Sequence, residues 1–132
     1  MCLMMLTGLH AQTDSTFVGR FENTDLKITL DINLVEKNIE VPGQEVLGTL
    51  DGFIGCEKTT TVWTIVASSI DSEDKATLEV VNNYGSEDFT ATLTRERDGS
   101  YTWKHLGGST LKFPVDGKWH KIPSKVVLKR KE

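Results

Sequence analysis

Leu-Lys-Ile-Thr-Leu-Asp-Ile-Asn-Leu, residues 26–34, alternates apolar and polar side chains without a break. Side chains on a β-strand point to the two faces of a sheet in turn, so this stretch predicts a strand with one face in a core and the other in water. The same period of two recurs at residues 76–80, 89–94 and 101–105. No window of helical length carries the apolar stripe of an amphipathic helix. The sequence therefore predicts an all-β protein.

Turn residues separate these stretches at short intervals. Asp98-Gly99 is the strongest signal and predicts a two-residue hairpin of type I′, in which both central residues have positive φ. Residues 71–74, 82–85 and 116–117 predict further turns, and residues 41–44 a longer loop. Eight or nine strands joined in this way make an antiparallel up-and-down meander. Such a meander avoids open edges by closing into a barrel of about eight strands, whose interior is filled by side chains or holds one small ligand.

The bulk properties of the chain are those of one ordinary globular domain. It has 132 residues, of which 38% are hydrophobic and 26% charged, with a formal net charge of -4. Nucleic acid is not expected as a partner, because phosphate binding needs clustered excess Lys and Arg.

The first eleven residues have the pattern of the end of an export signal. Residues 3–9 are mostly apolar, and Ala11 places a small residue where a signal peptidase cuts, before the polar residues 13–15. The apolar run is too short to span a membrane, and it lacks the basic residue that opens a signal, which indicates a start further upstream. We therefore expect residues 1–11 to be a signal-peptide remnant, residues 12–132 to be a single β-barrel domain, and the protein to be secreted or periplasmic. The alternative is an N-terminal strand or buried plug.

Residues 19–23, Gly-Arg-Phe-Glu-Asn, carry a family resemblance. They resemble the Gly-x-Trp-x-Asn that opens the first strand of avidin and streptavidin and the Gly-x-Trp that opens lipocalins, with Phe21 in place of Trp. Residues 47–50, Leu-Gly-Thr-Leu, are similar to the Thr-Gly-Thr-Tyr of the third avidin strand. The resemblance implies a small calycin-type barrel.

The biotin site of the avidin family is not retained. Asn23 matches the asparagine that bonds the ureido oxygen, but Lys27 stands where the family has serine and Leu50 where it has tyrosine. A site built for hydrogen bonds loses heavily when its donors are missing, so biotin is not expected as the ligand. The aspartate-tyrosine turn motif of lipocalins is absent. Arg130, however, is similar to the arginine that closes lipocalin barrels over the opening aromatic residue.

Aromatic residues on the predicted strands are the candidates for a ligand cavity, since ligand pockets are mostly apolar with a few placed polar groups. The predicted ligand-binding residues are Trp63, Phe89, Tyr101 and Trp103, with Asn23 as a polar anchor near the mouth; Trp119 belongs to the same aromatic set. We therefore expect a lipocalin-like protein that binds a small, largely apolar ligand. The alternative is a filled barrel that works through its surface, such as an inhibitor of a secreted enzyme or an envelope assembly factor.

Two further stretches predict surfaces. Residues 62–67, around Trp63, are apolar on both faces, so something should cover the outer face. A self-association patch or a loop folded back over the barrel would do so, and we expect a homodimer through this strand. Residues 118–131 are basic, which would attract an anionic glycan or lipid head group, or would protect an edge strand from strand addition.

Residues for catalysis or metal binding are scarce. His105 and His120 are the two histidines outside the leader, and they lack the spacing of a zinc site. Cys56 would be the lone cysteine after cleavage and is expected to be a small buried apolar residue. No nucleophile elbow or calcium loop is present. We expect no catalytic residues, no metal and no cofactor, and hence a protein that is not an enzyme.

Overall fold

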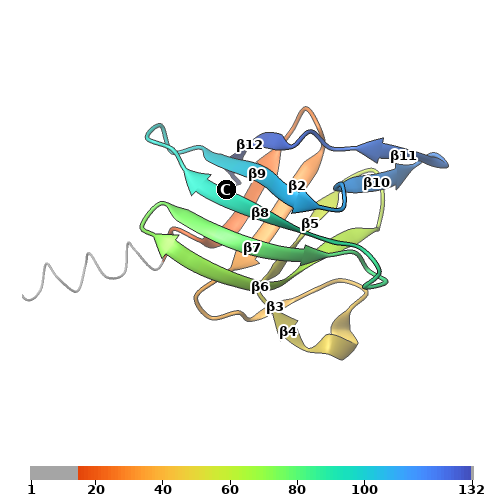
Figure 1. Cartoon of the computed structure of the whole chain (residues 1–132), viewed down its shortest axis with the longest axis horizontal. Helices are drawn as coiled ribbons and strands as arrows, with labels where there is room; N and C mark the ends of the chain where they lie inside the picture. The colour runs from red at the N-terminus through yellow and green to blue at the C-terminus, as the bar shows by residue number, and fades with distance from the viewer. Residues whose placement is uncertain (1–14, 132) are drawn as a thin grey trace, which may run out of the picture.

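The computed structural model describes residues 15–131, which form a closed antiparallel β-barrel (Figure 1). The predicted leader lies outside these residues. The strands are β1 (Val18–Asn23), β2 (Ile28–Asn33), β3 (Ile39–Glu40), β4 (Thr49–Leu50), β5 (Gly52–Cys56), β6 (Val62–Ser72), β7 (Lys75–Val81), β8 (Asp88–Arg95), β9 (Tyr101–Gly108), β10 (Lys112–Val115), β11 (Lys118–Lys121) and β12 (Lys125–Arg130), and the 3₁₀ helix η1 spans Glu45–Leu47. In the described part of the chain, no helix has the length and apolarity needed to cross a membrane.

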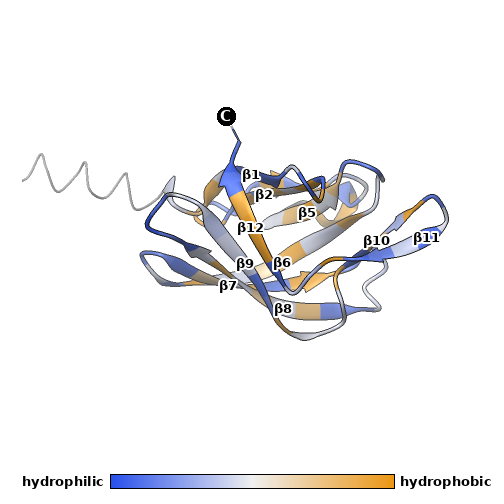
Figure 2. Ribbon diagram, turned by 90° about the horizontal axis from the view of Figure 1, so that it is seen from above, coloured by the Kyte–Doolittle hydropathy of each residue, from blue (hydrophilic) through white to orange (hydrophobic). Residues whose placement is uncertain are grey.

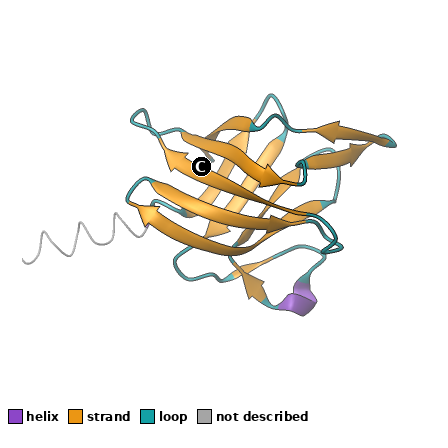
Figure 3. Ribbon diagram, viewed as in Figure 1, coloured by secondary structure: helices purple, strands orange, loops and turns teal. Residues whose placement is uncertain are grey.

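Eight strands make the barrel wall, in the order β1-β2-β5-β6-β7-β8-β9-β12 and back to β1. Two short ribbons, β3–β4 and β10–β11, leave the wall as separate two-stranded sheets, and η1 is the one helical piece that Figure 3 marks. The ring closes where β1 meets β12, with Phe21 opposite Arg130 and Glu22 opposite Lys129. The predicted all-β class and the up-and-down meander of about eight strands are confirmed.

The alternation of residues 26–34 sets the inside and the outside of the wall. Ile28, Leu30 and Ile32 are buried in the interior, while Thr29 and Asp31 lie on the outer side. Buried and less buried residues alternate in the same way along β7 and at the start of β9. Figure 2 shows hydrophobic and hydrophilic segments on the same wall strands. The inward side chains of all eight wall strands join into one continuous hydrophobic cluster.

The turn at Asp98-Gly99 corrects a prediction. Only Gly99 has positive φ, at +90°, and the Gly99 N–H donates to the Glu96 carbonyl at 3.0 Å. The Asp98 carboxylate accepts hydrogen bonds from the Ser100 N–H at 2.9 Å and the Ser100 hydroxyl at 2.6 Å. These bonds hold a three-residue loop with one left-handed residue, so the predicted type I′ turn is wrong here. The two-residue turn with positive φ at both positions, +53° and +79°, occurs instead at Asp116-Gly117.

The loop that carries β3 and β4 folds back over the outer side of β6. Thr64 is buried on that side although its strand neighbours Trp63 and Ile65 point into the core. Asp51 is buried beside β6, where its carboxylate accepts hydrogen bonds from the Ser68 hydroxyl and, at 2.8 Å, from the Lys37 ammonium. The outer face of residues 62–67 is therefore covered by a folded-back loop, which is one of the two alternatives that the sequence predicts. The homodimer through this strand stays a prediction.

Candidate functional site

The four aromatic residues predicted to line a cavity all lie inside the barrel. The ring of Phe89 is 5.4 Å from that of Trp63 and 6.1 Å from that of Trp103, between centroids. Tyr101 packs on Phe21 with their ring centroids 4.4 Å apart. All of these side chains are at most 2% exposed. The structure therefore places all four residues in the core cluster, where Phe89 packs on Trp63 and Trp103, and Tyr101 packs on Phe21.

The segment that follows β9 closes one end of the barrel. Leu111 and Phe113 are buried in the core cluster on either side of Lys112. The indole N–H of Trp63 donates to the backbone carbonyl of Lys112 at 2.9 Å. Because an indole has a single donor and no acceptor, Trp63 has no polar group left for a ligand.

Arg130 closes the other end. Its guanidinium carbon lies 4.8 Å from the centroid of the Phe21 ring, and its Nη1–H donates to the Val18 carbonyl at 2.7 Å. A second guanidinium nitrogen donates to the Tyr101 hydroxyl oxygen at 3.1 Å. A Cβ atom on Gly19 would lie 2.5 Å from Nη1, so the glycine leaves the space that the arginine occupies. Arg130 therefore covers the opening aromatic residue, as the lipocalin resemblance implies, and the closed barrel is compatible with a calycin-like fold.

Asn23 lies apart from the aromatic cluster, at the end of β1. Its amide nitrogen donates to the Val127 carbonyl at 2.9 Å, and its amide oxygen accepts the N–H of Leu26 at 2.9 Å. Both ends of the amide thus bind the chain's own backbone, and they fasten the β1–β2 turn to β12. The structure gives Asn23 a role in the turn, and within residues 15–131 its side-chain amide has no hydrogen bond to the predicted ligand residues.

Three hollows between described residues lie on the outer surface of the barrel. The first, of about 200 Å³, is lined by β1, β2 and β5. The second, of about 270 Å³, is lined by the β1–β2 turn and β12. The third, of about 380 Å³, is lined by the β6–β7 and β8–β9 turns. None of the three is lined by Trp63, Phe89, Tyr101 or Trp103.

Large apolar side chains are exposed on three loops at one end of the barrel. Val46 is 93% exposed and Leu47 55%, both on η1; Tyr84, on the β7–β8 turn, is 85% exposed; Trp119, on the β10–β11 ribbon, is 62% exposed. These are the four most exposed large apolar side chains in the described part of the chain. We call these three loops the loop surface. The ribbon that carries Trp119 projects beyond the barrel wall in both Figure 1 and Figure 2.

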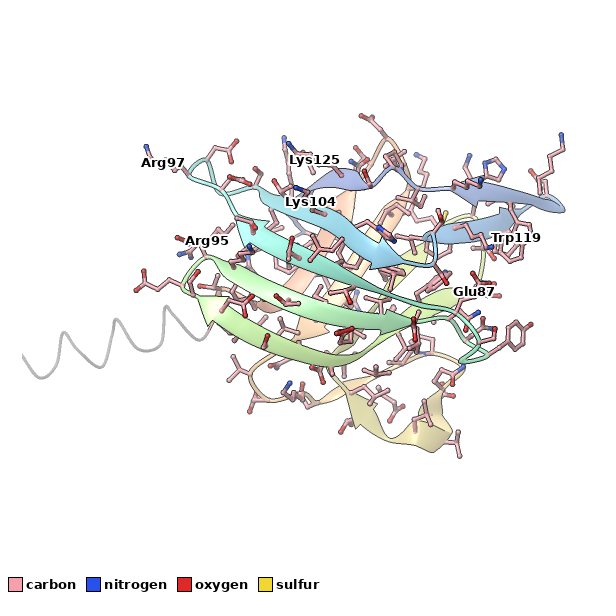
Figure 4. The ribbon with its side chains drawn as sticks, viewed as in Figure 1. Glu87, Arg95, Arg97, Lys104, Trp119 and Lys125 are labelled. Carbon is pink, nitrogen blue, oxygen red and sulfur yellow. The ribbon has the colours of Figure 1, made fainter. Side chains whose placement is uncertain are left out.

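Side-chain contacts join the three loops to one another. The ammonium of Lys112 lies 5.1 Å from the centroid of the Trp119 ring and 3.5 Å from a carboxylate oxygen of Glu87, at the end of the β7–β8 turn. The side-chain amide of Gln44 donates to the backbone carbonyl of Asn83 at 3.1 Å and so ties the η1 loop to that turn. Figure 4 shows Trp119 and Glu87 at the same end of the molecule, with Arg95 and Arg97 at the opposite end. The three loops that carry the exposed apolar residues are therefore connected.

The loop surface carries both signs of charge. Its β10–β11 ribbon is basic, with exposed Lys118 and Lys121 on β11. The η1 loop and the β7–β8 turn are acidic, through Glu45 and Glu87. Hydrogen bonds from the backbone N–H groups of Glu45 itself and of Gly43 lower the pKa of the Glu45 carboxyl, so this end of the surface stays negative. The loop surface thus combines exposed apolar groups with both a basic and an acidic region.

Most of this surface does not follow from the sequence pattern. The prediction that Trp119 belongs with the cavity aromatics is wrong, because β11 leaves the barrel wall and its side chains are exposed. Tyr84 carried a usable signal: a large aromatic residue inside the turn Asn82–Gly85 has no strand to point it into a core. Val46 and Leu47 carried a weaker one, as an apolar pair in a loop rich in turn residues.

Of the two described histidines, His105 packs within the barrel end and His120 lies at the surface. The Nε2 atom of His105 is 2.8 Å from the Ser109 carbonyl, and its ring packs 5.0 Å from that of Phe89. His120 is exposed on β11. Within residues 15–131, no three His, Cys, Asp or Glu side chains gather in a group that could hold a metal ion. Cys56 is a free thiol, partly buried against the core.

Comparison with known proteins gives no relative for this chain: no protein-family model, no curated protein and no solved structure matches it. Its function is therefore inferred from its own geometry.

Proposed function

We propose that the protein is a secreted or periplasmic, non-catalytic interaction protein that binds another protein through the loop surface. The observation that carries this proposal is that Val46, Leu47, Tyr84 and Trp119, the most exposed large apolar side chains, lie on three connected loops. Contiguous exposed apolar groups on a globular protein mark an interaction site, and functional residues concentrate on loops that a rigid scaffold holds.

A protein partner fits the composition of this surface better than a lipid or a glycan does. Protein interfaces combine aromatic anchors in their centre with a polar, charged rim, and Tyr84 and Trp119 are anchors of this kind. An anionic membrane would attract Lys118 and Lys121 but repel the acidic η1 loop and β7–β8 turn. Charges of both signs instead favour a partner with the complementary pattern, which also sets its orientation.

A filled interior supports this function over the binding of a small apolar ligand. The four aromatic residues expected to contact such a ligand are buried in the core cluster, where Phe89 packs on Trp63 and Trp103. Trp63 uses its one donor within the chain. The cavity function stays a prediction with its own test. Native mass spectrometry of protein taken from its source cells should give the mass of the chain alone; a small molecule bound in stoichiometric amount would favour the cavity function instead.

Photo-cross-linking in the source cells tests the proposal directly. A photoreactive amino acid is placed at Tyr84 or at Trp119, and, as matched controls, at Ile70 or Val127, which are exposed apolar positions on the wall strands β6 and β12, outside the loop surface. We expect a discrete cross-linked protein from the two loop positions and none from the wall positions, because only the loop surface touches the partner. Cross-links that are equally frequent at both kinds of position, or no cross-linked protein from either, would contradict the proposal.

A further inference from the structure

The outer edge of β11 presents backbone groups that nothing in the described structure binds. β11 pairs only with β10, and all four of its residues are exposed. The Ile122 N–H donates to the Leu111 carbonyl at 2.9 Å, so these two residues form a hydrogen-bonded pair of the ribbon. The next pair, Lys112 and Lys121, is then a non-hydrogen-bonded pair. Since bonded and non-bonded pairs alternate in an antiparallel ribbon, the N–H and carbonyl groups of Trp119 and Lys121 point away from β10. Among residues 15–131 no hydrogen bond to these groups is found.

The edge of β10, in contrast, is blocked. Pro114 lies opposite Trp119 and so occupies an outward-facing position, where it has no N–H to donate. The other outward-facing residue of β10 is Lys112, whose carbonyl already accepts the indole N–H of Trp63. The ribbon therefore has one closed edge, toward the barrel, and one open edge, on β11.

Charge decides what kind of strand the open edge accepts. Residues 112–131 contain seven of the fifteen Lys and Arg residues of the chain and one of its nineteen Asp and Glu residues. On β11 itself, Lys118 and His120 share one face of the ribbon, and Trp119 and Lys121 share the other. Like charges that face each other across two strands are destabilising, whereas opposite charges attract. Two copies of β11 would thus repel each other edge to edge, and an acidic strand would not.

We infer that β11 binds an extended acidic segment of the partner protein as an added β-strand. Main-chain hydrogen bonds to Trp119 and Lys121 would provide the affinity, as in other cases of strand addition, and carboxylates on the face of Lys118 the specificity. The indole of Trp119, held by Lys112, would cover an apolar residue of the segment. This inference rests on the proposed function, because it assigns a mode of binding to one of the three loops.

Synthetic peptides added to the full chain test the inference. The probe is a seven-residue peptide with Glu at alternate positions and Val and Thr between them. Its controls are the same peptide with Lys in place of Glu, and the Glu peptide N-methylated at alternate residues so that one edge cannot donate. Binding is followed by NMR of the backbone amides. We expect the Glu peptide to shift the amides of Trp119 and Lys121 and slow their exchange, the N-methylated peptide to bind at least about fivefold more weakly, and the Lys peptide not to bind.

Two variants separate the backbone from the charge. Lys121→Pro removes the outward N–H and the ammonium, while Lys121→Ala removes the ammonium alone. The proline variant should bind the Glu peptide at least about fivefold more weakly than the alanine variant, since it has lost a main-chain donor. The NMR signal of the Gly117 amide shows whether the ribbon is still folded in the proline variant. If the ribbon is unfolded there, the comparison of the N-methylated and unmodified Glu peptides on the wild-type chain still tests strand addition.

Equal binding of the N-methylated and unmodified Glu peptides would overturn strand addition, and so would equal affinity for an oligogalacturonate, an anionic glycan without peptide groups. The two proposals can fail separately. Peptide binding at β11 without cross-links from Tyr84 and Trp119 would refute the proposed function and leave the edge site standing. Cross-links without peptide binding would refute strand addition alone.

Discussion

Arg130, on the last strand of the barrel, lies with its guanidinium 4.8 Å from the ring of Phe21 on the first strand. The same guanidinium binds the Val18 carbonyl and the Tyr101 hydroxyl. One side chain thus joins the two strands where the ring closes and covers the end of the core. The scaffold that holds the loop surface depends on this closure.

Replacing Arg130 by Met should lower the free energy of unfolding by about 2 kcal/mol. The variant loses hydrogen bonds worth about 0.5–1.5 kcal/mol each and a cation–π contact of about 0.5–1 kcal/mol. Arg130→Lys keeps the positive charge but loses the planar, two-pronged guanidinium. Its free energy of unfolding should therefore lie between those of the wild type and Arg130→Met. Urea denaturation measures the three proteins, with Lys129→Met as the control on the opposite side of β12. An equal loss of unfolding free energy in Lys129→Met and Arg130→Met would contradict the role of Arg130 in closing the barrel.

Gly19→Ala should be destabilising, and its effect should depend on Arg130. The added Cβ would lie 2.5 Å from the Arg130 guanidinium, and the φ of +136° is unfavourable for any side chain. In the Arg130→Met background only the backbone strain is left. A double-mutant cycle should therefore give a coupling of about 1 kcal/mol. If the two losses of unfolding free energy simply add, Gly19 is needed only for its backbone conformation and not for the space that Arg130 occupies.

Asp51→Asn should loosen the loop that covers β6 without opening the barrel. The buried carboxylate loses its ion pair with Lys37 and weakens its bond to Ser68, at a cost of about 1–3 kcal/mol. Hydrogen exchange should speed up for the amides of residues 34–50 and stay unchanged in β7 and β8. Asp31→Asn, which breaks the more exposed pair with Arg20, is the matched control and should leave residues 34–50 protected. Uniformly faster exchange across the barrel would contradict a local role.

Ser100→Ala should raise the pKa of Asp98 toward its ordinary value. Hydrogen bonds from the Ser100 hydroxyl, first, and from the Ser100 N–H hold this pKa below that value. A carboxyl whose pKa is lowered by folding stabilises the fold above its unfolded pKa, and this contribution is lost as the pH falls through the lowered value. The β8–β9 turn should therefore loosen in acid, at higher pH in the variant than in the wild type. NMR titration of the Asp98 carboxyl checks both statements; an unchanged midpoint would refute the first.

The wall of the barrel was predictable because alternation depends only on neighbours in sequence. Residues 26–34 identify their own inner and outer faces, and the turn residues at 71–74, 82–85 and 98–99 mark the ends of β6, β7 and β8. Whether Trp63, Phe89 and Trp103 would leave a cavity was not predictable, since that depends on how strand tilt and stagger bring their volumes together. Arg130 could be placed over Phe21 only through the family resemblance.

The loop surface escaped prediction for a related reason. The period of two assigns Trp119 and Lys121 to one face of β11, but it does not say whether the ribbon lies on the barrel or projects from it. The contacts Lys112–Glu87 and Gln44–Asn83, which gather the loops, join segments far apart in the sequence. Such pairings follow from the closed wall and not from any local pattern.

The most direct test of the loop surface is the affinity for the cross-linked partner of a variant that combines Val46→Ser, Tyr84→Ser and Trp119→Ser. Its control combines Val66→Ser, Ile70→Ser and Val127→Ser on the wall strands β6 and β12, which removes three exposed apolar side chains outside the loop surface. Loss of two aromatic anchors should weaken binding at least about tenfold in the loop variant, and the control should bind as the wild type does. Equal affinity of both variants for the partner would contradict the account.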